Sequence, residues 1–515
     1  MAVLIDVKRS PIYNEFTSDE QERFFGISRD KVIHNIDTLY YSVLIGAGGY
    51  WDNFALKLKK MREDYNFDSD EEVKYCDLVY YPANFSIYRH CLREKDAFDI
   101  FIAEKVPNVN TPQIVVQLRS IVLWSDGEIN AIKKSFSAIE RLCVDNGLTI
   151  VDLYENRIDW AFHTNSIQNT TKFFGDKILI NNLKSTLTQY QKVGKVGREL
   201  TIDYLSLGKR QSNNIFFRAY NKTREVVEMG YKSIFIEIWR KHRLISEYDA
   251  YVLKYAFECK TSSKGFESSI SRGRIAWYLE YGRNKDIQAR LIELRENYQV
   301  ENSNIIALDN ELDQILPKIT QICNLEFQTK RHFYRSFGNT IGHTGDIALG
   351  RLFWILNHRK LFLELLTRDT VRFVKDKDKS AKDLVESDYM AFWRRVRACK
   401  TPCESDTELV RTYERNVNIK RAKTDFASKV ATLSVLRGNT DNNFAFNVAD
   451  TLCFFNDNDI NKIIEKMVDD DTGEFAALVC DDFDLLISRK KRQYKFLLDR
   501  INEEEDTPPE VPSDK

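Results

Sequence analysis

The chain has 515 residues, of which 43% are hydrophobic and 30% are charged, and its formal net charge at pH 7 is −1. This length and composition are typical of a globular protein with two or three domains. The nearly neutral balance argues against a surface that is basic throughout, so any contact with nucleic acid must be local.

The apolar runs and the cysteines indicate the cellular compartment of the protein. No run of about 18 apolar residues occurs, and the first residues lack the layout of a signal peptide. The nine cysteines are scattered and odd in number, so a disulfide framework is not expected. These features predict a cytoplasmic protein without membrane contact.

A polar N-terminal segment, residues 1–30, precedes a series of strand and helix patterns. The expected strands are 37–45, 76–88, 98–104, 113–124 and 150–162, and the expected helices are 51–65 and 128–146. Their order is that of a ferredoxin-like unit, an antiparallel sheet made of duplicated β-α-β units. We therefore predict an α+β fold in which helices cover one face of the sheet and the other face is open for a ligand.

The strand 150–162 contains the sequence YENRIDWAF. With a period of two, Arg157, Asp159 and His163 share one face. An extended strand would hold Asp159 and His163 about 13 Å apart, so a shared metal requires the strand to bend or end between them. The alternative is a surface aspartate paired with Arg157, with His163 as an isolated polar residue.

The region from Lys172 to Arg224 has many more basic than acidic residues. Its first part, 164–198, is polar and amide-rich with helical patches. This composition predicts a segment that lies along DNA or over the site, and the alternative is a long exposed insertion.

Residues from Ile215 onward alternate, and the predicted strand places Arg218, Tyr220, Lys222 and Arg224 on one face. A tyrosine between cations is placed where a phosphate would be held, and its phenol oxygen could attack phosphorus. The alternative is an amphipathic strand with solvated basic residues. A second predicted strand, 234–239, carries Glu237 in an apolar run, where a carboxylate needs a metal or a basic partner.

After Ser246 the apolar residues follow a helical spacing. We expect a catalytic domain at 31–260, a helical region at 261–437, a helical extension at 438–500, and a disordered acidic tail at 501–515.

The segment GKRQSNNIFFRAYNKTRE resembles a motif of rolling-circle replication initiators, the replication initiation factor or Rep-trans family of Gram-positive plasmids, phages and integrative conjugative elements. The matching residues are Gly208, Arg210, Ser212, Arg218, Tyr220, Lys222 and Glu225. Asn221 stands where the family usually has Asp.

The resemblance extends to the strands on either side of this segment. The family's "RIDxAxD" strand is matched by Arg157, Ile158, Asp159 and Ala161, with His163 in place of the second Asp. The family binds a divalent cation through acidic side chains of the sheet. The resemblance therefore implies Mg²⁺ or Mn²⁺ held by Asp159 and Glu237, with His163 as the third ligand.

The family's activity implies that Tyr220 nicks one DNA strand at an origin, forming a 5′-phosphotyrosine link and leaving a free 3′ hydroxyl. Arg218 and Lys222 would act at the scissile phosphate. Further DNA contacts are expected from Lys209, Arg210, Ser212 and Arg224. Tyr204 is a rival nucleophile, and Tyr231 is a more distant one.

Two other functions fit the same sequence. One is a conjugative relaxase of the same family, and the other is a non-catalytic DNA-binding regulator that keeps the fold. The expected partners are origin DNA, single-stranded or cruciform, a host helicase, and a second copy of the chain in a homodimer.

Overall fold

The structure is a computed structural model, and the residues it describes belong to one compact unit within Met1–Tyr413. The described residues are 5–46, 49–69, 71–105, 111–170, 179–181, 188–196, 199–211, 213–230, 232–259, 265–298, 305–335, 337, 350–375 and 385–399. The predicted extension 438–500 and tail 501–515 lie outside them. Within these residues, none of the helices is long and apolar enough to cross a membrane.

The first half of the unit is the predicted ferredoxin-like unit. Its two β-α-β elements are β1 (Val32–Ile45), α3 (Gly49–Glu63) and β5 (Phe98–Ala103), then β6 (Ile114–Leu118), α5 (Glu128–Asn146) and β7 (Ile150–Thr164). The strand order is β7-β1-β6-β5 and every neighbouring pair is antiparallel. The fold class is thus confirmed, whereas the predicted strand 76–88 falls on two separate strands, Leu78–Phe85 and Tyr88–Glu94.

Additional strands extend this sheet at its β5 edge. They are β2 (Lys74–Tyr75), β3 (Leu78–Phe85) and β4 (Tyr88–Glu94), which pair in sequence and join β5. The predicted strand 113–124 is shorter than expected, because Arg119 precedes a short helix, α4 (Ser120–Ser125).

The second half of the sheet contains a strand that the sequence analysis missed. The strands β9 (Thr188–Val196), β10 (Glu199–Leu207) and β11 (Ile215–Asn221) form a meander, and β12 (Cys323–Lys330) lies between β11 and β7. The described part of the segment 164–198 contains β9 and also β8 (Leu179–Asn181), which pairs with β13 (Val371–Phe373). The residues 171–178, 182–187 and 197–198 lie outside the described residues, so the predicted helical patches stay a prediction.

A helical lobe separates β11 from β12 in the chain. It comprises α7 (Lys222–Glu228), α8 (Ser233–Lys241), α9 (Glu247–Glu258), α10 (Phe266–Tyr281), α11 (Lys285–Asn297) and α12 (Ile305–Ile315). Together with α1 (Ile5–Arg9), η1 (Pro11–Glu15) and α2 (Ser18–Phe25), it has its own apolar core around Trp239, Tyr248 and Trp277.

The prediction of a strand at 234–239 is wrong, because these residues form α8. Phe235, Ile236 and Trp239 are its buried side chains, a spacing that fits one side of a helix. A short run of β-branched and aromatic residues suits a strand and a buried helix equally well, so its period could not distinguish them.

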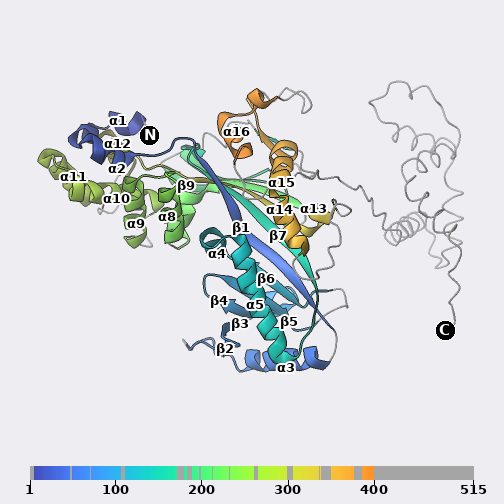
Figure 1. Cartoon of the computed structure of the whole chain (residues 1–515). Helices are drawn as coiled ribbons and strands as arrows, with labels where there is room; N and C mark the ends of the chain where they lie inside the picture. Colours follow the sequence, from blue (N-terminus) through green and yellow to red (C-terminus); the bar gives the residue numbers. More distant parts are fainter. Residues whose placement is uncertain are drawn as a thin grey trace, which may run out of the picture. The chain divides into compact units, whose positions relative to one another are not determined.

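The two faces of the sheet differ in chemistry. Leu39, Trp160 and Phe327 belong to one apolar core that α3 and α5 cover in the first half of the sheet. In the second half the same core is covered by α13 (Arg331–Arg335), α14 (Gly350–Asn357), α15 (Arg359–Leu365) and α16 (Ala391–Arg397), as Figure 1 shows. The opposite face carries tyrosines and charged side chains, and it holds the candidate site.

Phe327 tests the position of β12 within the sheet. Its side chain is fully buried against Phe217 and Trp393. Phe327→Ala should lower the free energy of unfolding by about 3 to 5 kcal/mol in urea titrations, because it leaves a cavity in the core. The matched control is Phe67→Ala, whose ring is 78% exposed. Equal effects of the two changes would contradict this placement.

Candidate functional site

The hydroxyl of Tyr220 lies at the centre of a polar cluster on the open face of the sheet. Asn324 Nδ2 donates a hydrogen bond to it over 2.9 Å, and Lys222 Nζ donates over 3.3 Å. The hydroxyl is also 3.5 Å from Glu326 Oε2, an acceptor for its proton. Burial raises the pKa of this half-buried phenol above its usual value, and the charge of Lys222 opposes that shift.

The local turns explain how Tyr220 and Lys222 meet. The β10–β11 hairpin turns at Gly208, whose φ of 85° favours glycine. At its other end β11 stops at Asn221, whose side chain accepts a hydrogen bond from the Arg224 N–H and so begins α7. Lys222 is therefore the first residue of a helix, whereas the sequence analysis placed it in the strand. From this first turn its ammonium group still reaches the phenol.

Lys222 is almost completely buried, with 1% of the residue exposed. Burial lowers the pKa of its ammonium group, but the charges of Asp37, Tyr220 and Glu225 outweigh burial and raise it. Glu225 Oε2 lies 2.6 Å from the nitrogen and Asp37 Oδ1 lies 4.0 Å from it. The ammonium group therefore stays charged beside the phenol.

Glu326 is the buried carboxylate of the cluster. It lies opposite Arg218 in the β11–β12 register, and the guanidinium donates two hydrogen bonds of 2.8 Å to its oxygens. Burial raises the pKa of Glu326 to about 7, the charge of Arg218 opposes the shift, and the charges of Asp159 and Asp37 add to it. Burial of the carboxylate is therefore the main cause of its raised pKa.

Asp37 and Asp159 lie on adjacent strands. The β1–β7 register shifts between Ile36 and Thr38, so Asp37 is the extra residue of a β-bulge next to Asp159. Asp37 is 7% exposed, and its Oδ1 has no hydrogen-bond partner. Asp159 accepts hydrogen bonds from the guanidinium of Arg157, as one of the sequence alternatives expected.

The three predicted metal ligands are not brought together. Glu237 is exposed on α8, because its segment is a helix rather than a strand. His163 is fully buried, stacked on Trp124, and its Nδ1 accepts a hydrogen bond from Trp239. Burial, with the charge of Lys222, holds the pKa of His163 well below its usual range. Within the described part of the chain, no three His, Cys, Asp or Glu side chains are grouped closely enough to hold a metal ion.

The predicted DNA-contacting residues lie in different places. Lys209 and Arg210 are exposed at the β10–β11 turn, and Ser212 lies outside the described residues. Arg224 is buried on α7, where it pairs with Glu267 and lies over the ring of Phe266. The predicted strand placed Arg224 on the same face as Tyr220. In the structure the strand ends at Asn221, and Arg224 lies on α7.

The rival tyrosines are also located differently. Tyr204 is paired with Tyr220 across the β10–β11 register, and the two rings stack with centroids 6.4 Å apart. Tyr231 lies outside the described residues. Tyr204 is therefore a neighbour of the site, and among the described residues it makes no hydrogen bond to Asn324 or Lys222.

A band of cations continues from the cluster along β12. Lys330 Nζ donates to the backbone oxygens of Arg210 and Gln211, each over 2.7 Å. Burial and the nearby charges of Arg157 and Arg210 lower the pKa of Lys330. We call Arg157, Arg210 and Lys330 the cationic band; their mutual repulsion would be relieved by an anion.

The sequence analysis missed Glu326, Asn324 and Asp37. A signal for the first two existed in CNLEFQTK, where Leu325 and Phe327 alternate with Asn324, Glu326 and Gln328. Asp37 had no such signal, because the bulge that turns it toward the site depends on the pairing of β1 with β7.

Comparisons with known proteins complete the description of the site. No family model matches the chain, and no curated protein matches it. Among solved structures, the chain is similar to the rolling-circle replication initiator protein from Geobacillus stearothermophilus, with a TM-score of 0.33 and 10% identity. This similarity covers 73% of the present chain and 100% of the other.

The titration of Glu326 can be measured through stability. Because its pKa is raised to about 7, the folded protein binds a proton that the unfolded chain has already released. Stability from this group is therefore lost as the pH rises. Relative to Glu326→Gln, the free energy of unfolding of the wild type should fall by about 2 kcal/mol between about pH 5 and about pH 7.5. Urea titrations across this range test it, and a constant or rising difference contradicts it.

Proposed function

We propose that the protein is a tyrosine-dependent DNA nicking enzyme that initiates rolling-circle replication. The observation that carries this proposal is the position of the Tyr220 hydroxyl between two donors, Asn324 and Lys222, and one carboxylate, Glu326. A phenol with this surrounding can lose its proton and act as a nucleophile. The matching motif around Gly208, Arg218 and Lys222 supports the same chemistry.

In the proposed reaction the Tyr220 oxygen attacks the phosphorus of a DNA phosphodiester. A bond forms between the phenol oxygen and phosphorus, and the bond from phosphorus to the 3′ oxygen breaks. The strand is left with a 5′ phosphate on Tyr220 and a free 3′ hydroxyl, which can prime synthesis.

Glu326 is the group that accepts the phenol proton in this proposal. It is the carboxylate 3.5 Å from the hydroxyl, and its pKa of about 7 lets it change protonation state near neutrality. Lys222 and Asn324 donate to the same oxygen and so stabilise the phenolate as it forms.

Cations of the open face are proposed to hold the DNA backbone. Arg218 lies beside Tyr220, and the cationic band continues along β12 from Glu326 toward Lys330. Contacts of this kind position a strand without reading its sequence. A local group of cations on this face is compatible with a chain whose net charge is nearly zero.

A divalent ion is proposed to bind two of the acids. Mg²⁺ commonly binds through one or two carboxylates, with water and substrate phosphate as its other ligands. Asp37, whose Oδ1 has no hydrogen-bond partner, and Asp159, next to it across the bulge, would hold Mg²⁺ or Mn²⁺. When bound, the ion would neutralise charge on the phosphate. Asp37 thus replaces Glu237 and His163 in the proposed ligand set.

The biological setting follows from this chemistry as part of the proposal. The substrate is origin DNA, single-stranded or in a cruciform, and a helicase and a second copy of the chain would assist. A conjugative relaxase would use the same site. A DNA-binding regulator on this fold would bind the same DNA and form no covalent product.

Tyr220→Phe should abolish the covalent adduct between the protein and DNA, because it removes the attacking oxygen. The measurement is a denaturing gel of full-length protein incubated with labelled single-stranded origin DNA and Mg²⁺ or Mn²⁺. Tyr204→Phe is the matched control, since the Tyr204 ring stacks on Tyr220 and the change keeps that ring. An adduct that survives Tyr220→Phe and disappears in Tyr204→Phe would move the nucleophile, and a wild type that forms none would favour the regulator.

Asp37→Asn should weaken binding of the divalent ion and slow nicking. The amide keeps the size of the side chain but removes its charge, so we expect roughly a hundredfold slower nicking and a higher Mg²⁺ requirement. Binding of single-stranded DNA, measured by fluorescence anisotropy, should change little. Glu237→Gln is the control, because Glu237 is exposed on α8. Equal loss in both variants would count against the revised ligand set.

A further inference from the structure

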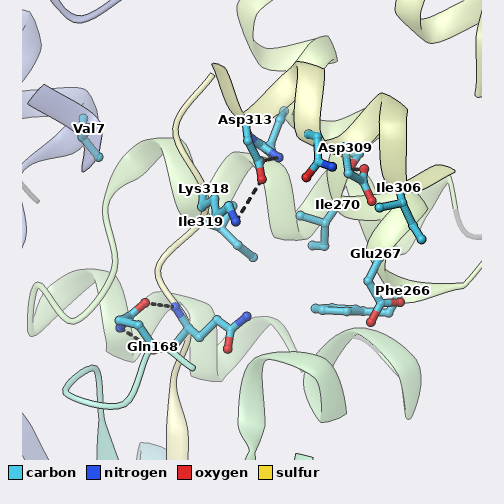
Figure 2. A pocket seen from close by; sticks show the side chains of 14 residues that line it. Val7, Gln168, Phe266, Glu267, Ile270, Ile306, Asp309, Asp313, Lys318 and Ile319 are labelled. Carbon is cyan, nitrogen blue, oxygen red and sulfur yellow. Dashed lines mark hydrogen bonds and ion pairs between the residues drawn. The ribbon is translucent and has the colours of Figure 1, made fainter. Parts of the chain in front are cut away.

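The helical lobe contains a cavity of about 380 Å³ that the proposed chemistry does not use. It is lined by α10, α12 and the connector that leads into β12. Figure 2 shows the ring of Phe266 nearly edge-on at one side of the cavity, with Ile270 and Asp309 across from it. The size and the mixed lining are those of a site for a small, flat organic group.

The apolar part of the lining provides a stacking surface. Phe266 is 7% exposed, and the guanidinium of Arg224 lies 5.0 Å from its ring centre. Arg224 is held in turn by Glu267, so the ring has a fixed position between charged neighbours. Ile270 and Ile319 supply further apolar contact. An aromatic base could stack on such a ring.

The polar part of the lining is arranged to accept hydrogen bonds. Asp309 Oδ1 accepts from Ser271 Oγ over 2.7 Å and from the Tyr298 hydroxyl over 2.6 Å. Among the described residues no group donates to Asp309 Oδ2. Glu267 is similar, since Arg224 binds Oε1, and no described residue donates to Oε2. Arg274 and Lys318 also line the cavity, and both pair with Asp313. The remaining oxygens of Asp309 and Glu267 favour a ligand that donates protons.

The cavity and the tyrosine cluster are linked by one hydrogen bond and by short stretches of chain. Gln321, which lines the cavity, accepts a hydrogen bond from Asn221 and precedes Asn324 by three residues, about 10 Å of extended chain. The helix α7 joins the two places as well, since its first turn sends Lys222 to Tyr220 and Arg224 to Phe266. A nucleotide near the one attached to Tyr220 would thus come within reach of the cavity.

We propose that this cavity binds a guanine base of the DNA strand, an inference that rests on the proposed function. Guanine has adjacent N1–H and N2–H₂ donors on its Watson–Crick edge, which match the unused oxygens of Asp309 and Glu267. Its rings stack on Phe266. Thymine has one such donor and no amino group, and the carboxylates repel a phosphate. The cavity therefore gives the enzyme a preference for sequence that the cationic band cannot give.

The test measures binding of full-length Tyr220→Phe protein, which cannot form the proposed adduct. Fluorescence anisotropy compares a short labelled oligothymidine with the same strand carrying one central guanine. The oligothymidine strand can slide along the protein until its one guanine reaches the cavity, so the origin sequence is not needed. The guanine strand should bind about tenfold more tightly. Hypoxanthine, which lacks the 2-amino group, should lose most of this gain.

Variants of the cavity provide the controls. Ile306→Trp fills the cavity from a position that is 37% exposed, and Ile292→Trp adds the same ring on α11 at a position that is 40% exposed and outside the lining. The guanine preference should disappear in Ile306→Trp and in Asp309→Asn, and it should persist in Ile292→Trp. Affinity for plain oligothymidine should be equal in all of them.

The outcomes separate this proposal from the nicking activity. Equal affinity for both strands, no binding of either strand, or a preference that persists in Ile306→Trp and Asp309→Asn would overturn the guanine site. A guanine preference in a protein whose wild type forms no adduct would keep the site and overturn the nicking proposal.

Discussion

The site depends on the charge pairing across β11 and β12. Arg218 and Glu326 face each other in register, and their two hydrogen bonds fix the carboxylate beside the Tyr220 hydroxyl. Removing either partner would leave an unpaired buried charge, which is far more costly than losing an exposed ion pair. The other polar contacts of the cluster, including those of Asn324 and Lys222, are built around this pair.

The cluster also shows how a sheet face can be polar and still be part of a stable fold. The opposite face of the same strands carries Leu325, Phe327 and Phe217 in a continuous apolar core, which helices cover on both halves of the sheet. Because side chains alternate along a strand, each residue that contributes to the core places its neighbour on the open face. The fold can therefore support a cluster of buried charges on one side with apolar packing on the other.

Local patterns predicted much of the first half of the chain and part of the site. The ferredoxin-like order followed from the periodicity, and Arg218 and Tyr220 were placed together by alternation within one strand. Partners from distant segments were not predictable in this way. Glu326 is 106 residues from Tyr220, and Asp37 turns toward the cluster only because β1 bulges against β7. Glu237 was assigned to a strand because the apolar run around it fits a strand and a buried helix equally well.

The late position of β12 in the sequence has a consequence for synthesis of the protein. The phenol is made before the helical lobe, whereas its carboxylate partner follows that lobe. A nascent or prematurely terminated chain that ends before Cys323 has Tyr220 without Glu326 and Asn324, and the strand that lies between β7 and β11 is missing. The polar cluster around the phenol can therefore assemble only after the ribosome has delivered the helical lobe and β12.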